Sequence, residues 1–347
     1  MNELRDKPKF ITRYEELIKS YLYHTVSAYD GNTSLYINNY FGWTDENDNQ
    51  VSLGYQGKGF RPSICLLICD SLEGDINAAC PSAISIELVH NFSLIHDDIE
   101  DNDKYRRHQP TLWAIWGIPK ALLAGNSILV LGNQELNKLI NFGITKQNLF
   151  KSQKILTESY LKMMEGQFLD IAFESQEIIS KEEYINMIGL KTGALIECAV
   201  MLGAVASKKT LSKQDLFQIS KFGRNIGLLF QIRDDILGVW GSDKTGKPIG
   251  ADIKKKKKSL PIILTLNQER GVYKDIINKI MHKPELNDKD IERFIEIMNV
   301  LNIKKECEDI SREYAHKIQE ILQNIPVEQN FKSDFNDIAQ FLVSRET

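Results

Sequence analysis

The chain has 347 residues, of which 42% are hydrophobic and 26% are charged, values ordinary for a globular protein with a full core. Its net charge of −4 excludes a protein that binds nucleic acid broadly, because such proteins carry a strongly basic surface. Anionic ligands must therefore be bound by local groups of basic side chains.

The N-terminal segment MNELRDKPKF lacks the apolar stretch of a signal peptide, and no run approaches the length that a membrane span requires. We therefore expect no stable membrane insertion. The cysteines stand in apolar contexts and are odd in number, which indicates core packing in a reducing, cytoplasmic setting. They are Cys65, Cys69, Cys80, Cys198 and Cys307.

Helical periodicity runs through most of the chain, and the alternation typical of strands is nearly absent. It predicts helices at about 9–29, 60–73, 81–102, 117–141, 147–175, 181–206, 212–240, 259–282, 288–300, 302–324 and 328–345. Polar, glycine-bearing segments at 44–59 and 241–258 predict loops. We expect one large all-α domain over 1–347, with an N-terminal helix and loop (1–55), a core (56–265) and outer C-terminal helices (266–347).

The segment from Pro81 to Pro110 begins as an apolar helical pattern and ends in a dense acidic cluster. Asp97 and Asp101 are four residues apart, so on a helix they lie one turn apart on the same face, and His90 lies two turns before Asp97. Carboxylate oxygens suit Mg²⁺, which keeps several waters and shares its other positions with substrate phosphate. A solvated acidic helix end is the alternative interpretation, since DDxxD alone is a weak signal.

A second carboxylate pair, Asp234 and Asp235, ends another apolar helical segment, FQIRDDILGVWG at 230–241. Each of the two acidic pairs is followed by a basic loop. If the two pairs face each other across a bundle interior, they would hold several divalent ions in one cavity.

Six ordered motifs resemble those of one family, the trans-isoprenyl diphosphate synthases or polyprenyl synthetases. They are GKGFRP (57–62), HDDIEDNDKYRRHQPT (96–111), GQFLDI (166–171), KTG (191–193), FQIRDDILG (230–238) and GKPIGADIKKKKKSLP (246–261). The resemblance implies an all-α helical bundle of the isoprenoid synthase type with a central cavity. It also implies a transferase of isoprenoid biosynthesis that joins an allylic diphosphate to isopentenyl diphosphate.

The resemblance assigns roles to individual positions. It makes Asp97, Asp101 and Asp234 the main ligands of Mg²⁺ (three ions, with Mn²⁺ as an alternative), with Asp98 and Asp235 close by. The side chains that would bind the allylic diphosphate are Arg106, Lys191, Thr192, Gln231, Lys247 and Lys257. Loss of diphosphate leaves an allylic carbocation, and the bound metal stabilises the charge that develops on the leaving group. The released diphosphate would then take the proton, so no side-chain base is needed.

The second diphosphate needs its own cationic pocket, and the matching positions are Lys58, Arg61, His90 and Arg107. The alternatives are that His90 is a plain core histidine and that Lys58 and Arg61, beside Gly57 and Gly59, are ordinary surface charges. The run Lys254–Lys258 would usually be a solvated segment, whereas the resemblance suggests a flap over the diphosphates.

The chain departs from the family pattern at three positions. Lys256 stands where the family has the glycine before its loop lysine, which leaves the alignment of Lys257 uncertain by one residue. Gly238 replaces the last aspartate of the second motif, so we expect altered metal affinity rather than inactivity. Asn126 replaces an acid after the first motif, and we expect this to affect helix packing only.

The resemblance implies that product length depends on the helix that precedes the first motif, where bulky side chains block the growing chain. Ser93 lies one turn before Asp97 and is small, whereas Phe92 is bulky. By resemblance, a single aromatic here is typical of the twenty-carbon (geranylgeranyl) type. The alternatives are that Phe92 is plain core and that other helices form the floor of the tunnel that holds the growing chain.

Two other functions stay open. A terpene cyclase uses the same metal clusters but needs no isopentenyl site, and Trp113, Trp116 and Trp240 could stabilise carbocations. A non-catalytic partner subunit of a heteromeric synthase would be expected to lose metal ligands, yet DDIED is intact. The family expectation for assembly is a homodimer.

Overall fold

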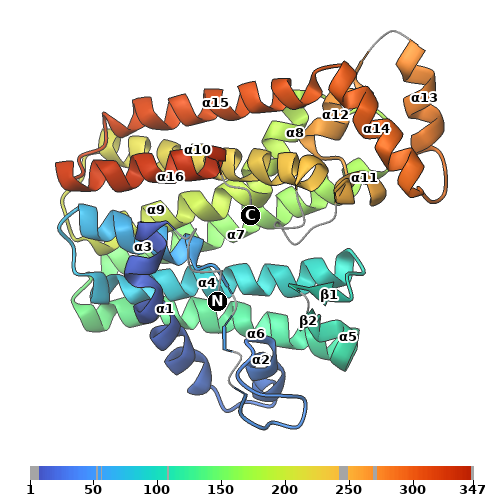
Figure 1. Ribbon diagram of the computed structural model, residues 1–347. Coiled ribbons are helices and arrows are strands. Elements are labelled where there is room, and N and C mark those ends of the chain that lie inside the picture. The colour runs from blue at the N-terminus through green and yellow to red at the C-terminus, as the bar shows by residue number, and fades with distance from the viewer. Residues whose placement is uncertain are drawn as a thin grey trace. The chain divides into compact units, whose positions relative to one another are not determined.

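The computed structural model describes residues 8–51, 54–55, 57–107, 109–241, 249–268 and 272–344 (Figure 1). Its contacts group into two compact units. Unit 1 comprises Met1–Tyr160, Cys198–Ser220 and Pro326–Asp334, and unit 2 comprises Leu161–Glu197, Lys221–Ile325 and Phe335–Thr347. The expectation of one domain over 1–347 with a central cavity stays a prediction.

Unit 1 is built mainly from helices of the N-terminal half. They are α1 (Lys9–Ser27), α2 (Ser34–Tyr40), α3 (Phe60–Ser71), α4 (Ile76–Glu100), α5 (Leu112–Trp116), α6 (Ile118–Asn137) and the short 3₁₀ helix η1 (Lys138–Phe142). The C-terminal part of the chain adds the short 3₁₀ helix η4 (Gln329–Phe331). Among the described residues the named strands are β1 (Tyr105–Arg106) and β2 (Gln109–Pro110), an antiparallel pair with Tyr105 opposite Pro110. The all-α prediction is therefore confirmed.

Unit 2 holds the remaining elements that lie wholly in one unit. They are α8 (Lys181–Ile188), the π-helical turn η2 (Gly189–Gly193), α11 (Ala251–Lys254), α12 (Leu260–Leu266), α13 (Val272–Met281), α14 (Asp288–Val300) and α15 (Ile303–Leu322). The helices α7 (Lys146–Glu174), α9 (Ala194–Ala206), α10 (Lys213–Trp240) and α16 (Lys332–Ser344) have residues in both units.

Two predicted helix boundaries are wrong. Helix α4 begins at Ile76, not at Pro81, because the Asp75 side chain accepts a hydrogen bond from the Asn77 backbone N–H (2.9 Å) and caps the helix there. The proline lies inside the helix and marks no boundary. The predicted helix 259–282 is two helices, α12 and α13. The short elements α2, α5, α11, β1 and β2 were not predicted.

Helix α4 packs against α3 and α6 at the centre of unit 1. The Ser85 hydroxyl donates to the Gly132 carbonyl of α6 (2.7 Å), and a Cβ on Gly132 would lie 3.1 Å from the Ser85 carbonyl oxygen. The glycine thus lets the two backbones approach closely. This packing fixes the helix that carries the first acidic cluster, Asp97, Asp98 and Asp101.

The expectation that no run is long enough to span a membrane is wrong on length. Helix α4 and the segment Lys181–Ala206 both reach the required length and apolar composition. In their apolar windows, however, 83% and 78% of the residues are buried inside the protein, as in core helices.

The core of unit 2 gathers side chains from α8, α10, α12, α14 and α15. Ile232 and Ile236 of α10 are buried in it together with Leu260 of α12 and Phe294 of α14. This burial positions the end of α10, which carries the second acidic cluster, Asp234 and Asp235.

Candidate active site

The end of α4 is tied to the following hairpin through Asp98. This side chain is only 2% exposed, and its Oδ1 accepts a hydrogen bond from Arg106 Nε of β1 (2.7 Å). The Asp103 carbonyl in turn accepts from Thr111 Oγ1 (2.8 Å) and Trp113 Nε1 (2.9 Å). Burial raises the pKa of Asp98 to about 6, against the lowering effect of Arg106.

Arg61 and His90, two of the residues predicted for the second cationic pocket, meet within unit 1. Arg61 Nη1 lies 3.1 Å from His90 Nε2. Burial lowers the pKa of His90 well below its usual value, and the positive charges of Arg61, Arg107 and Arg106 lower it further. The site therefore contains a neutral imidazole among three guanidinium groups, an arrangement suited to an anion.

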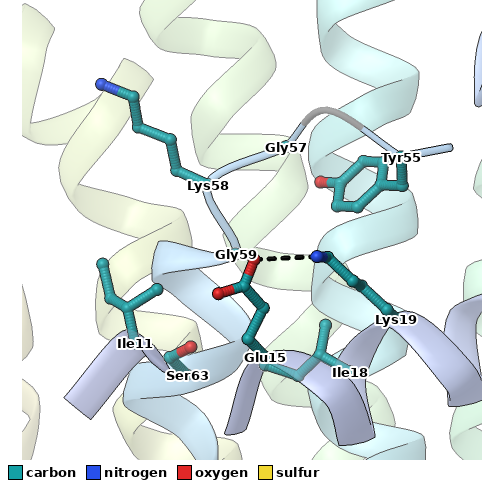
Figure 2. A pocket seen from close by; sticks show the side chains of 9 residues that line it. All are labelled: Ile11, Glu15, Ile18, Lys19, Tyr55, Gly57, Lys58, Gly59 and Ser63. Carbon is teal, nitrogen blue, oxygen red and sulfur yellow. Dashed lines mark ion pairs between the residues drawn. The ribbon is translucent and has the colours of Figure 1, made fainter. Parts of the chain in front are cut away.

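The loop before α3 carries Lys58, which was also predicted for the second cationic pocket. Gly59, at the N-cap of α3, has a φ of 63°, a left-handed conformation that glycine adopts without strain. Lys58 is exposed. Figure 2 shows its side chain directed away from the small pocket beside α1, on whose α1 side Glu15 and Lys19 form an ion pair one helical turn apart (2.9 Å).

In unit 2, Lys191 and Thr192 lie in the π-helical turn η2. Lys191 Nζ donates to Asp170 Oδ2 of α7 (2.5 Å), and Thr192 Oγ1 donates to Gln231 Oε1 of α10 (2.8 Å). A π turn inserts one residue into a helix and is frequent at functional sites. The structure thus brings together the predicted residues Lys191, Thr192 and Gln231.

Asp235 is buried among donors. Its Oδ1 accepts from Gln231 Nε2 (2.9 Å), and its Oδ2 accepts from the Leu260 backbone N–H (2.9 Å) and from the Tyr184 hydroxyl. Burial raises the pKa of Asp235 to about 6, which the charge of Lys257 opposes. This carboxylate is engaged by three groups of the protein itself.

Lys257 lies among the carboxylates of unit 2. Burial alone would lower its pKa, but negative charges nearby raise it above the ordinary lysine value. These charges belong to Asp235, Asp252, Asp170 and Asp234.

The lysine run around Lys257 is attached to the rest of unit 2. Lys256 has a φ of 53°, the conformation that favours glycine, at the position where the family pattern has its glycine. This agrees with the alignment that makes Lys257 the loop lysine. Lys258 Nζ donates to the Gln176 carbonyl (2.6 Å), and Lys256 Nζ donates to the Lys283 carbonyl. Lys247 lies outside the described residues.

The carboxylates fit Mg²⁺ that is shared with a substrate. Within the described part of the chain no three or more His, Cys, Asp or Glu side chains are grouped so that they could hold a metal ion by themselves. Mg²⁺ needs no such cage, because it binds through one or two carboxylates plus waters and substrate phosphates. Asp97 and Asp101, in the last turn and at the C-cap of α4, supply such oxygens.

Several functional candidates were missed from the sequence. Tyr55 donates a short hydrogen bond to Glu87, a buried carboxylate of α4 that also receives the Asn91 amide (3.3 Å), and Tyr40 donates to Asn91 Oδ1 (3.0 Å). This network ties the loop before α3 to α4. A lone acid within an apolar helix was the signal available for Glu87.

The tryptophans that favoured the alternative of a terpene cyclase have structural roles. Trp113 donates to the Asp103 carbonyl, and Trp116 donates to Asn39 Oδ1 (3.2 Å) and packs against Tyr36. Trp240 packs against the core of unit 2.

Phe92 and Ser93 occupy different surroundings on α4. Phe92 is 5% exposed, and its ring centroid lies 4.6 Å from that of His96. The His96 ring approaches Gly125 of α6 so closely that a Cβ there would lie 2.7 Å from it. Ser93 is half-buried, and its hydroxyl donates to the His90 carbonyl (2.8 Å).

Comparison with known proteins agrees with these features. Residues 48–298 match the family model described as polyprenyl synthetase. The geranylgeranyl diphosphate synthase of Saccharolobus solfataricus is 35% identical over 292 residues, 83% of this chain and 86% of the relative. A (2E,6E)-farnesyl diphosphate synthase of Mycobacterium tuberculosis is 29% identical over 335 residues, 95% of this chain and 91% of the relative. A solved geranylgeranyl pyrophosphate synthetase of Pyrococcus horikoshii has 29% identity and a TM-score of 0.85, covering 96% of this chain and 97% of that structure.

The fold is therefore the all-α fold of the isoprenoid synthases. Within that class, the chain belongs to the polyprenyl synthetase family. The resemblance seen in the sequence is confirmed.

Proposed function

We propose that the protein condenses an allylic diphosphate with isopentenyl diphosphate to a longer all-trans prenyl diphosphate. The observation that carries this proposal is the contact between Arg61 and His90, near the charges of Arg106 and Arg107. A cyclase ionises one diphosphate and has no use for a second anion site. The engaged tryptophans remove the feature that favoured a cyclase, and the intact acidic cluster on α4 disfavours a non-catalytic subunit.

We assign the binding of three Mg²⁺ ions to Asp97, Asp101 and Asp234, with Mn²⁺ as an alternative. Bound Mg²⁺ would neutralise the negative charge that develops on the leaving diphosphate. Asp98 and Asp235 are satisfied by protein donors, so their part in this proposal is to hold the ends of α4 and α10 in place.

The allylic diphosphate is bound by Arg106, Lys191 and Lys257, and Thr192 and Gln231 assist. Lys191 is paired with Asp170, and Lys257 keeps its charge because carboxylates surround it. A diphosphate oxygen can replace a carboxylate as the acceptor of either ammonium group. Lys247 is assigned to the same role from the family motif alone.

Isopentenyl diphosphate is bound by Lys58, Arg61, His90 and Arg107. The isopentenyl double bond attacks the allylic carbocation, and the proton lost afterwards passes to the released diphosphate. No further base is required among the side chains.

The product is proposed to be the twenty-carbon geranylgeranyl diphosphate, on the basis of Phe92 and Ser93. Phe92 is held by its contact with His96, so its ring can block a growing chain. Ser93 is too small to do so.

The same proposal makes the protein a cytoplasmic homodimer. Its five cysteines are buried and unpaired, which suits a reducing compartment. Helix α6 exposes Ile118, Leu122, Leu123 and Val130, and this row of apolar side chains is suited to cover by a second copy of the chain. A monomeric mass in sedimentation equilibrium would contradict the dimer.

Release of inorganic diphosphate tests the reaction class. We expect release only when Mg²⁺, isopentenyl diphosphate and a short allylic diphosphate are all present. Release from one long prenyl diphosphate alone, with a hydrocarbon as the product, would show a cyclase instead.

A further inference from the structure

Gly238 stands inside α10, four residues after Asp234, where the second motif has no carboxylate of its own. Glycine is unfavourable inside a helix, and Gly238 is not among the residues with positive φ. Its backbone conformation therefore does not require glycine. The reason lies in the space around it.

The carboxylate of Asp252 fills that space. A Cβ built on Gly238 would lie 2.3 Å from Asp252 Oδ2, 2.5 Å from its Cγ and 2.8 Å from its Oδ1. Real Cβ contacts are essentially never this short, so any side chain at position 238 would displace the carboxylate. A side chain at position 238 of α10 and the carboxylate of Asp252 of α11 therefore cannot occupy this space together.

Helix α11 is hydrogen-bonded to α10 next to Gly238. The Gly250 N–H, at the N-cap of α11, donates to the carbonyl of Val239, the residue after Gly238 (3.1 Å). Ile253 is fully buried, and Asp252 is only 7% exposed. The carboxylate is therefore held in place by its own helix.

Asp252 is also connected to the loop lysine. The Lys257 N–H donates to the Asp252 carbonyl (2.9 Å), and the charge of the Asp252 carboxylate acts on the Lys257 ammonium group together with that of Asp235. A single residue thus contacts Gly238 through its side chain and sets the start of the segment that carries Lys257.

We propose that Asp252 is a positioning residue, whose carboxylate takes the place left by Gly238 and holds Lys257 toward Asp234 and Asp235. This inference rests on the proposed function, in which Lys257 binds the allylic diphosphate. The second acidic cluster thereby obtains its third carboxylate from α11 instead of α10.

A double-mutant cycle tests the proposal. Gly238→Ala displaces the carboxylate and Asp252→Ala removes it, so each should raise KM for the allylic diphosphate by roughly 10-fold, as for one contact to a charged group, and leave KM for isopentenyl diphosphate unchanged. The double variant should be no worse than Asp252→Ala alone, because the methyl group added at position 238 then meets no carboxylate. Additive effects of the two substitutions would overturn the proposal.

Asp252→Asn keeps the shape and removes the charge, and it should raise the same KM. A wild-type KM in this variant would overturn the positioning role. The matched control is Asp290→Asn on α14, a carboxylate of similar burial (8% exposed) that is paired with Lys283 (2.6 Å). We expect it to lower the melting temperature without changing either KM.

Calorimetry measures the affinity of the same variants for inorganic diphosphate with Mg²⁺, without turnover. Weaker binding in Asp252→Asn than in Asp290→Asn supports the inference, and equal binding contradicts it. If the wild-type protein forms no prenyl product, the proposed reaction fails, whereas the binding comparison still decides the role of Asp252.

Discussion

At the scale of the residue, His90 is a neutral histidine surrounded by positive charge. Because its folded-state pKa lies well below 6.5, the unfolded chain binds a proton near pH 6 that the folded chain does not. Stability contributed by His90 is therefore complete above pH 6.5 and is lost as the pH falls below this value. For one proton the slope is at most about 1.4 kcal/mol per pH unit.

Replacing His90 by glutamine should remove this dependence. We expect the melting temperature of the wild-type protein to fall relative to that of His90→Gln between about pH 7 and about pH 5. Asp98 and Asp235, with pKa values raised to about 6, change stability in the opposite direction, but they do so in both proteins. Parallel melting curves across this range would show that His90 titrates normally.

Lys257 is expected to be the lysine of the run that serves the reaction. Lys257→Ala should lower kcat by roughly 100-fold, as for loss of one fixed donor to a developing charge. Lys254→Ala, at an exposed position of the same run, should leave kcat unchanged. Lys257→Arg retains the charge and checks that Lys257→Ala does not act through misfolding. Equal activity of Lys257→Ala and Lys254→Ala would contradict the assignment.

The sequence could predict those residues whose relation is set by one helix. Asp97 and Asp101 follow from the helical repeat alone, and Thr192 and Gln231 were found because they stand in recognisable motifs. Asp252 and Glu87 were missed, although Asp252 stands in a quoted motif. Their roles depend on contacts with residues far away in the chain, Gly238 and Tyr55, which no local pattern contains.

At the scale of the element, α4 carries both the acidic cluster and the residues proposed to limit chain length. Phe92→Ala should yield products longer than those of the wild type, because it removes the ring that blocks the chain. Ser93→Phe should yield shorter ones, because it adds a second ring one position closer to Asp97. Chromatography of the dephosphorylated products measures both. An unchanged product length in both variants, with melting temperatures that show folded protein, would mean that the floor is set by other elements.

Element boundaries were predictable where caps and apolar periodicity agree, and unpredictable where they conflict. The capping box of Ser180 and Glu183 starts α8 at the predicted place. Pro81 suggested a helix start, because proline favours the first turn, but it lies inside α4, whose cap is Asp75. Helix α11 is four residues long and has too few turns to show a period.

At the scale of the whole molecule, the all-α class follows from periodicity over nearly every segment, and the family follows from six motifs in order. Composition and charge excluded broad nucleic-acid binding but carried no information on the reaction. The two apolar helices long enough for a membrane show why burial has to be known as well as length, since α4 is a core helix. The number of domains, the metal ions and the dimer stay predictions.

The most direct test of the central claim follows labelled isopentenyl diphosphate into product. Purified protein is incubated with Mg²⁺, the labelled substrate and farnesyl diphosphate, and the dephosphorylated products are separated by chromatography. We predict a labelled prenyl alcohol one isoprene unit longer than farnesol. Absence of label from every prenyl product, with this primer and with shorter ones, would contradict the account.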